Sequence, residues 1–526
     1  MISKFIPIPQ ACGEREVDSR PLNAFWTTSV LKRALLIAVP AFVFPFIAML
    51  AHFLIQGAFY LDSGFFGFLL SEADLLMKFP PVLGEGTYMA THVSPAFWPM
   101  QWLSQLLQIK PHLMVGIWQG LLFAGMGIAG LVFVERAHLE NSLRNSRWMW
   151  FVLLLLPFSG LALSILVYPH TEAMAMSVLF LSLALSLEEN VLAQVSSWLL
   201  LVFALMVRED VGFHVFGLYM TFLVLAFVSQ KLPTQWKKIL TAAVIGFLYS
   251  IVVLKIQKSY FTGDNAFARI YSGDPAWAHV GVQFLAKRIG EFLIHKPYLS
   301  IPLVIYIVYV ARTRSLVMAA PVLAFVPWLA VNLAAIAPTA GSVMAYYAYP
   351  LLALFIWPLV TLRLEGSELS SREQRNLVVL CASMLIVSLL GYRSAMGRGL
   401  FKWMNPINLS LLWNGKYEEH QCAVEKFLAA ASGKRSMGPQ YAALFPGRYS
   451  KEEIYFEPFE VLKSDHVMIW KDSYFVNTFK NDEGVREHFE KVFEDESVNV
   501  IWRRKLAKQP TIDWKNIFSS CREGKQ

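Results

Sequence analysis

Long apolar runs, separated by short polar segments, recur along the chain up to about residue 392. A bilayer core about 30 Å thick is crossed by roughly 20 apolar residues in helical conformation. The pattern therefore predicts about eleven transmembrane helices, the shortest of which would cross only with little tilt or with local thinning of the membrane. Their approximate bounds are 33–56, 111–134, 148–167, 171–187, 193–207, 211–228, 239–256, 297–311, 315–336, 343–362 and 376–392.

Composition agrees with an α-helical polytopic membrane protein. Of the 526 residues, 56% are hydrophobic and 16% are charged, whereas soluble domains carry about 25% charged residues. This balance excludes a soluble enzyme and a disordered protein. The net charge of +8 would suggest a nucleic-acid partner in a soluble protein. Here the positive charge lies mostly in short loops, so membrane topology explains it and we expect no nucleic-acid partner.

The loops predict the orientation. If residues 1–32 are cytoplasmic, the inner loops hold about twice as many Lys and Arg as the outer loops, as the positive-inside rule requires. The membrane domain then covers 33–392, with long outer loops at 57–110 and 257–296. A loop as long as the first is typical of a functional segment, and its aromatic residues and prolines suggest helices that lie on the membrane surface.

The tail, residues 393–526, has shorter apolar runs and more charge, and it predicts a small extracytoplasmic α/β domain. Cys422 and Cys521 would lie in an oxidising space and could pair there. Two free thiols are an equally good prediction, because spacing in the sequence does not fix the distance between two cysteines.

Conspicuous polar residues gather on the predicted outer side, although the topology was drawn from hydropathy and Lys/Arg alone. A common face indicates one site. The residues are Asp62 after the first span, His92 in the first outer loop, His170 and Glu172 in the second outer turn, Arg208, Glu209 and Asp210 in the third, Arg269 in loop 257–296, and Tyr346 and Tyr347 at the start of the tenth span.

Each group also has a plain structural interpretation. Asp62 could cap a helix, and His170 could donate to a carbonyl in an interhelical turn. Arg208, Glu209 and Asp210 could form an internally neutralised turn. The tyrosines could belong to an ordinary aromatic belt at the membrane interface.

The residue types fit sugar transfer. An acceptor hydroxyl that attacks an activated sugar needs a general base, and the departing phosphate needs cations or a metal. Asp62 suits the base, and Arg208 and Arg269, with Lys287 and Arg288, are candidate phosphate partners. The sequence has no Gly-rich nucleotide loop, which favours a lipid-linked donor over a cytosolic nucleotide sugar.

The order of these motifs resembles the GT-C superfamily of polytopic glycosyltransferases, which place a catalytic Asp or Glu in a long first extracytoplasmic loop. More closely, the chain resembles an uncharacterised prokaryotic membrane-protein family related to that superfamily. The matching elements are Asp62-Ser63-Gly64, His92-Val93-Ser94-Pro95, His170-Thr171-Glu172, Glu209-Asp210, Tyr347, Pro439 and Arg448. Thr171 stands where the family usually has Pro, and Leu61 where an aromatic residue is common.

This resemblance implies a GT-C-like fold and an inverting glycosyltransferase of a bacterial inner membrane. The donor would be a polyprenyl-phosphate sugar and the acceptor a glycan, lipid or protein outside the cytoplasm. Asp62 would be catalytic. The expected substrate-binding residues are His92, His170, Glu172, Arg208, Glu209, Asp210, Arg269, Tyr346 and Tyr347. A divalent cation, Mg²⁺ or Mn²⁺, is a candidate cofactor, with Asp62, Glu209 and Asp210 as candidate ligands.

A transporter or flippase of a lipid-linked sugar is the alternative function. Transporters place ionisable residues near the bilayer midplane and often contain inverted repeats. The predicted spans contain few charges and the sequence has no convincing repeat, so the enzyme is favoured. A scaffold with an outer binding domain would leave the clustered carboxylates and histidines unexplained.

Overall fold

The structure is a computed structural model. It describes residues 28–54, 61–72, 75–77, 87–167, 170, 174–261, 267–343, 347–396, 416–437, 464–470, 481, 483–494, 499–505 and 511–523.

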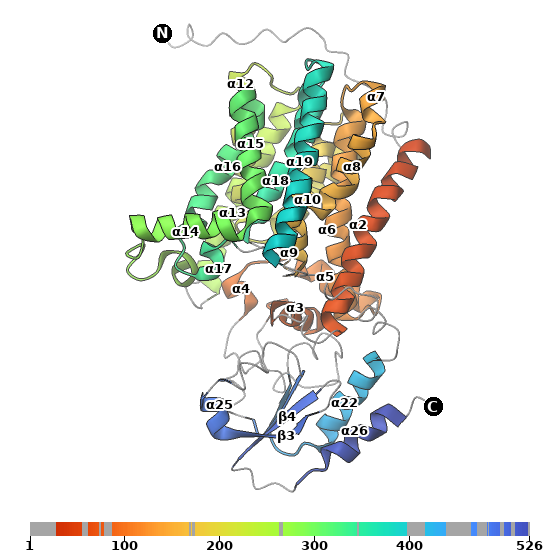
Figure 1. Ribbon diagram of the computed structural model, residues 1–526, viewed down its shortest axis with the longest axis vertical. Helices are drawn as coiled ribbons and strands as arrows, with labels where there is room; N and C mark the ends of the chain where they lie inside the picture. Colours follow the sequence, from red (N-terminus) through yellow and green to blue (C-terminus); the bar gives the residue numbers. More distant parts are fainter. Residues whose placement is uncertain are drawn as a thin grey trace.

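Helices dominate the described residues and form the bundle of Figure 1. Seven helical stretches among them are long and apolar enough to cross a membrane, as expected of a polytopic membrane protein. They are α2 (Thr28–Leu54), α6 (Pro111–Arg136), the consecutive α8 (Arg147–Leu155), η2 (Leu156–Phe158) and α9 (Gly160–Val167), α12 (Val211–Val228), α13 (Trp236–Tyr260), α16 (Leu316–Leu333) and α19 (Ser371–Met396).

The other four predicted spans are also helical but do not meet that length test on their own. Two are the shorter apolar helices α10 (Met174–Ser186) and α11 (Val191–Val207). The predicted eighth span is α15 (Pro297–Thr313), which meets α14 (Val282–His295) at a bend of 98°. The tenth is divided into η6 (Tyr349–Leu352) and α18 (Ala353–Glu365). The count of eleven crossings therefore stays a prediction.

Short helices cover one end of the bundle, which we call the α4 end. The predicted outer loop 57–110 contains α3 (Leu61–Glu72), α4 (Tyr88–Thr91) and α5 (Phe97–Leu106), and α17 (Pro338–Gly341) lies nearby in Figure 1. Thr87 caps α4, since its side chain accepts a hydrogen bond from the backbone N–H of Met89 at 3.1 Å. The first loop is thus partly helical, as predicted.

Close backbone contact joins α12 to α13 near this end. A Cβ atom on Gly212 would stand 2.0 Å from the carbonyl oxygen of Gly246 and 2.5 Å from the Ser250 hydroxyl. Only glycine fits such an approach. The contact fixes the turn that precedes α12 beside α13.

Buried ion pairs hold the opposite end of the bundle, near α7 (Asn141–Arg144) in Figure 1. Arg136 and Arg363 lie 3.0 Å and 3.6 Å from the carboxylate of Glu188. Arg33 pairs with Glu135 at 2.6 Å. Arg136 and Arg363 lie near the ends of their helices, in segments that the sequence predicts to be inner loops.

A four-stranded sheet lies beyond the α4 end in Figure 1. Its strands are β1 (Arg435–Met437), β2 (His466–Trp470), β3 (Phe489–Glu494) and β4 (Asn499–Arg504), and its helices are α22 (Lys416–Ala430), α25 (Glu483–His488) and α26 (Trp514–Glu523). The strand order is β1-β2-β4-β3, with β1 and β2 parallel and the other pairs antiparallel. A disulfide between Cys422 and Cys521 joins α22 to α26. This structure therefore favours pairing over free thiols.

Candidate functional site

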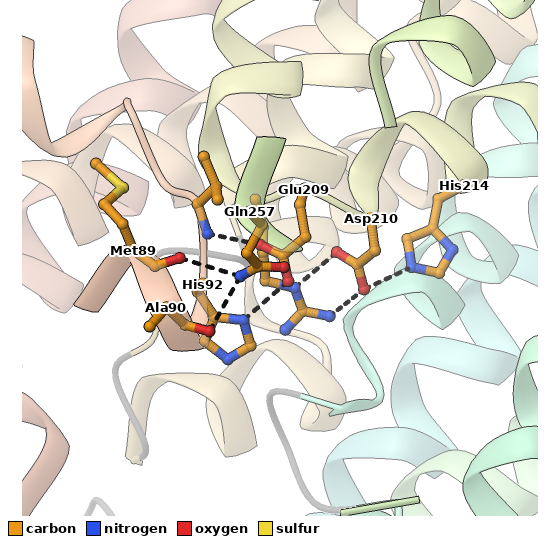
Figure 2. Close-up of polar contacts among 9 residues, drawn as sticks. Met89, Ala90, His92, Glu209, Asp210, His214 and Gln257 are labelled. Carbon is orange, nitrogen blue, oxygen red and sulfur yellow. Dashed lines mark hydrogen bonds and ion pairs between the residues drawn. The ribbon is translucent and has the colours of Figure 1, made fainter. Parts of the chain in front are cut away.

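Three charged residues form the turn between two apolar helices at the α4 end. Helix α11 ends at Val207 and α12 begins at Val211, so Arg208, Glu209 and Asp210 interrupt the apolar run. The backbone N–H of Val211 donates to the carbonyl of Arg208 at 3.2 Å and closes the turn. The carboxylates of Glu209 and Asp210 take different partners, as Figure 2 shows.

Glu209 faces the His92 segment. One carboxylate oxygen lies 3.0 Å from Nδ1 of His92, and the other accepts the backbone N–H of Val93 at 2.9 Å. The Glu209 side chain is 10% exposed and the His92 side chain 24%. Residues 117 positions apart are thus joined by a charge-assisted contact.

Two further hydrogen bonds fix the same segment. Nε2 of Gln257, on α13, donates to the carbonyls of Met89 at 3.1 Å and Ala90 at 3.4 Å (Figure 2). The backbone N–H of Ala96 donates to the carbonyl of Met206 at 2.9 Å. Helix α4 and the residues after it are therefore fastened to both α11 and α13.

Asp210 faces Arg208 and α12. Arg208 Nε donates to one oxygen of Asp210 at 2.6 Å, and a guanidinium nitrogen donates to the other. His214, one turn along α12, has its Nε2 3.9 Å from the Asp210 carboxylate. Burial alone would raise the pKa of Asp210, but the charge and hydrogen bond of Arg208 outweigh it, so the pKa lies below its usual range. Asp210 is therefore ionised at neutral pH.

The predicted outer loop 257–296 also reaches this turn. The backbone of Ile270 and Tyr271, in η4 (Ala268–Ser272), accepts hydrogen bonds from Ala337 at 3.0 Å and Ile336 at 3.1 Å. The Tyr271 ring contacts that of Tyr347, with 6.4 Å between centroids. Burial raises the pKa of the Tyr271 hydroxyl, the charge of Arg208 works against the rise, and Tyr347, Asp210 and Glu209 add to it. Tyr347 thus lies beside the cluster.

His170 joins the site through aromatic contacts. The buried His170 ring stands edge-on to Phe66 of α3 at 5.2 Å. Phe66 contacts Tyr88 at 6.1 Å, and Tyr88 contacts His92 at 5.8 Å. The structure therefore connects His170 to His92 through two rings.

Other predicted site residues are placed less fully. Asp62 belongs to α3, but its side chain is not among the described parts of the structure. Glu172 and Tyr346 lie outside the described residues altogether. Arg269 is an exposed residue of η4. Lys287 and Arg288 pair with Glu291 on α14, at 3.9 Å and 3.3 Å, and the Arg288 guanidinium lies over Phe284. Their charges are therefore partly balanced within α14.

Glu209 and Asp210, two of the three candidate ligands of the predicted divalent cation, have other partners in this arrangement. Both oxygens of Glu209 and both oxygens of Asp210 are already engaged by His92, Val93 and Arg208. Among the described residues, no group of three or more His, Cys, Asp or Glu side chains could hold a metal ion. Cation binding that involves Asp62 stays a prediction.

Three neighbours of the cluster were absent from the predicted site. Gln257 supports the His92 segment, His214 faces Asp210, and the Tyr349 ring lies under the Arg208 guanidinium at 5.9 Å. A signal for His214 was present in the sequence, because a residue four positions after Asp210 shares its helix face. Gln257 is an ordinary polar residue of an apolar helix, and only the fold brings it to the site.

No protein-family model matches the chain, and no curated protein sequence matches it. Among solved structures, the chain is similar to the arabinofuranosyltransferase AftD from Mycobacteria, with 11% sequence identity and a TM-score of 0.40. The likeness covers 90% of this chain but 40% of that one, so the chain spans well under half the length of AftD. A likeness this low assigns neither a family nor an activity to this chain.

Proposed function

We propose that this protein is a membrane glycosyltransferase that moves a sugar from a polyprenyl-phosphate donor to an acceptor outside the cytoplasm. The acceptor would be a glycan, a lipid or a protein, and the transfer would invert the anomeric centre. The observation that carries the proposal is a cluster of paired ionisable residues at the α4 end, immediately before the candidate span α12. In it, Glu209 contacts His92 and Asp210 contacts Arg208.

The position of the cluster suits a lipid-linked substrate. Asp210 directly precedes Val211, the first residue of a helix that is apolar enough to cross the bilayer. Ionisable groups at such a boundary lie at the depth of lipid headgroups, where the phosphate of a polyprenyl-linked sugar is also found. A charged side chain at this boundary is costly only if it points into lipid, and here Glu209 and Asp210 point to His92 and Arg208 instead.

The disulfide supports an extracytoplasmic α4 end. Disulfides persist in oxidising compartments and are rare in the cytosol. The Cys422–Cys521 bond belongs to the sheet-containing segment, which lies beyond the α4 end in Figure 1. We therefore propose a multi-pass protein of a bacterial inner membrane with a cytoplasmic N-terminus and a periplasmic or extracellular C-terminal segment.

The placement of the cluster favours transfer over transport. Arg208, Glu209 and Asp210 lie between helices, and His92 follows α4, so none of the four is within a candidate span. A flippase would need polar contacts that continue into the bilayer midplane.

Reconstitution tests the proposal. The purified protein in liposomes receives radiolabelled polyprenyl-phosphate monosaccharides, with detergent-extracted cell-envelope material as acceptor. We expect label in the acceptor fraction. Movement of intact lipid-linked sugar between leaflets, without any transfer, would instead identify a flippase and refute the proposal.

The predicted base has its own test. If Asp62 accepts the proton of the acceptor hydroxyl, Asp62→Asn lowers the transfer rate by about 10²- to 10⁴-fold at unchanged expression. Unimpaired turnover would remove Asp62 from the mechanism and leave the glycosyltransferase proposal standing.

A further inference from the structure

We propose that His92 is the general base that deprotonates the acceptor hydroxyl, and that Glu209 is its positioning residue. The assignment rests on the proposed glycosyl transfer and gives the proton-accepting role to His92 in place of Asp62. It is drawn from how the two side chains meet in the structure.

The contact with Glu209 selects one tautomer of His92. An ionised carboxylate only accepts hydrogen bonds, so Nδ1 of His92, 3.0 Å away, carries the hydrogen. The neutral ring then has its lone pair on Nε2, the atom that can take a proton from substrate. Because Val93 N–H donates to the second oxygen of Glu209 at 2.9 Å, the carboxylate is held at both ends and fixes the ring orientation.

Nε2 is directed away from the cluster. Figure 2 shows the second ring nitrogen of His92 on the side opposite to Glu209. Within the part of the chain that the structure describes, no hydrogen bond to this nitrogen is found. The His92 side chain keeps 24% of its surface exposed, whereas Glu209 keeps 10%. An open acceptor beside a covered carboxylate is the arrangement of a positioned base.

Other histidines near the α4 end are placed differently. Nε2 of His279 contacts the carbonyl of Ala334 at 2.8 Å. His214 is buried among the rings of Phe325, Trp328 and Tyr349. His170 is buried against Phe66. Among the contacts between described residues, that of His92 combines a carboxylate partner at hydrogen-bond distance with a side chain that is partly exposed.

The step balances without a further reagent. The acceptor hydroxyl oxygen forms a bond to the anomeric carbon of the sugar, and its proton passes to Nε2 of His92. The bond between the anomeric carbon and the phosphate oxygen breaks, and the electron pair leaves with the lipid phosphate. Glu209 stabilises the imidazolium that forms, and the proton then passes to water.

The charged and titratable groups around His92 come from several elements. Glu209 contacts it and Asp210 interacts with it electrostatically from the α11–α12 turn, where Asp210 also pairs with Arg208, and the Tyr88 ring contacts it from α4. Tyr249 of α13 and Tyr271 of η4 interact electrostatically with Glu209. The turn supplies two carboxylates and one guanidinium, so its net charge favours a proton that arrives on His92 during the reaction.

The pH dependence of transfer tests the pair. In the liposome assay with radiolabelled polyprenyl-phosphate monosaccharides, wild-type kcat/KM should fall on the acid side as His92 becomes protonated. His92→Ala should lower kcat by about 100-fold or more and abolish that acid limb. Glu209→Gln keeps a similar shape but removes the charge that holds the His92 ring, so kcat should fall by about 10-fold or more with little change in the KM of the lipid-linked sugar. His279→Gln is the matched control and should change neither rate nor profile.

Chemical modification gives a second readout. Diethyl pyrocarbonate modifies neutral imidazole, so mass spectrometry should find His92 modified before His214 and His170 in the wild-type protein. Transfer by His92→Ala with an unchanged rate and pH profile would overturn the assignment, as would protection of His92 from the reagent. If wild-type protein transfers sugar from none of the donors, the proposed function fails first, and the role of His92 falls with it.

Discussion

Arg208 donates two hydrogen bonds to the carboxylate of Asp210, while Glu209, the residue between them, faces His92. Neighbouring carboxylates on one turn thus have separate partners. Asp210 pairs with Arg208, whose side chain is only 6% exposed, and Glu209 holds the imidazole ring of His92. The first pair anchors the turn, and the second belongs to the proposed chemistry.

Removing one member of the Arg208–Asp210 pair should destabilise the protein. Asp210→Asn removes the charge of the carboxylate that accepts two hydrogen bonds from the buried Arg208 guanidinium, which is costly because a buried ion pair loses one of its charges. Since Asp210 keeps 30% of its side chain exposed, we expect a loss on the order of 2 kcal/mol. Thermal unfolding of the detergent-purified protein would measure it. The double variant Arg208→Gln/Asp210→Asn should recover part of the loss, and full additivity of the two changes would contradict the pairing.

The helix crossing at Gly212 should tolerate no side chain. Gly212→Ala places a methyl group against the Gly246 carbonyl, so α12 and α13 must separate, at a cost of about 1–3 kcal/mol. Because the α11–α12 turn precedes Gly212, transfer activity should fall as well. Gly217→Ala is the matched control on the same helix, since its new Cβ would lie 3.6 Å from the Ala324 carbonyl, an ordinary contact. Equal stability of the two variants would show that the helices do not meet as described.

The disulfide offers a test of orientation. A membrane-impermeant maleimide added to intact spheroplasts should not label Cys422 or Cys521 until an impermeant reductant is supplied. Cys381, which is buried, should stay unlabelled throughout. Cys422→Ser should lower the stability of the C-terminal segment by about 2–4 kcal/mol, as losses of structural disulfides do. Labelling that appears only after the membrane has been permeabilised would place this segment in the cytoplasm.

Helix α14 should lie along the membrane surface. It meets α15 at 98°, and its exposed apolar residues Val282, Ala286, Ile289 and Leu293 share one face, since they recur at helical spacing. Lys287 lies on another face and is 76% exposed at its side chain. A nitroxide at residue 289 should therefore collide more with oxygen than with a water-soluble nickel complex, and one at residue 287 should show the reverse. Equal access at both positions would rule out an interfacial helix.

Apolar periodicity was enough to find the helices but not their breaks. The tenth predicted span was one apolar run, yet the structure divides it into η6 and α18 near Pro350. The eighth predicted span matches α15, but the bend at Lys296 was not predicted. The helix before it, α14, is amphipathic, and its hydropathy resembles that of a polar loop. The length and hydropathy of a segment indicate whether it can lie in lipid. Where a helix breaks depends on how neighbouring helices pack against it, which sequence spacing does not reveal.

The sequence was enough to identify the ionisable residues of the site. His92, Glu209 and Asp210 stood out because they fall on the predicted outer side together with the other conspicuous polar residues. Their pairing could not be predicted, since the Glu209–His92 contact spans 117 positions and depends on the hydrogen bonds of Gln257 and Ala96. Lys287 and Arg288 were candidate phosphate partners from charge alone, but the structure pairs both with Glu291.

His466 should make the sheet less stable in acid. Burial lowers the pKa of His466 below its model-peptide value of 6.5, although the Ser432 carbonyl, which contacts Nδ1 at 3.2 Å, and the Asp465 carboxylate oppose the shift. Below pH 6.5, His466 therefore binds a proton more readily in the unfolded chain than in the folded chain. The stability contributed by neutral His466 is full above that pH and falls as the pH is lowered toward the pKa of the folded state. The loss is roughly 1.4 kcal/mol for each unit of the shift.

Hydrogen exchange of β2 and β4 in the full-length protein, corrected for intrinsic rates, would follow this loss between pH 7.5 and 5 at about half-unit steps. His466→Gln retains a donor for the Ser432 carbonyl but does not titrate, so its protection should vary less with pH than that of the wild type. His488→Gln, at the end of α25, is the control and should keep the wild-type slope. An unchanged slope in His466→Gln would mean that another group governs the acid sensitivity of the sheet.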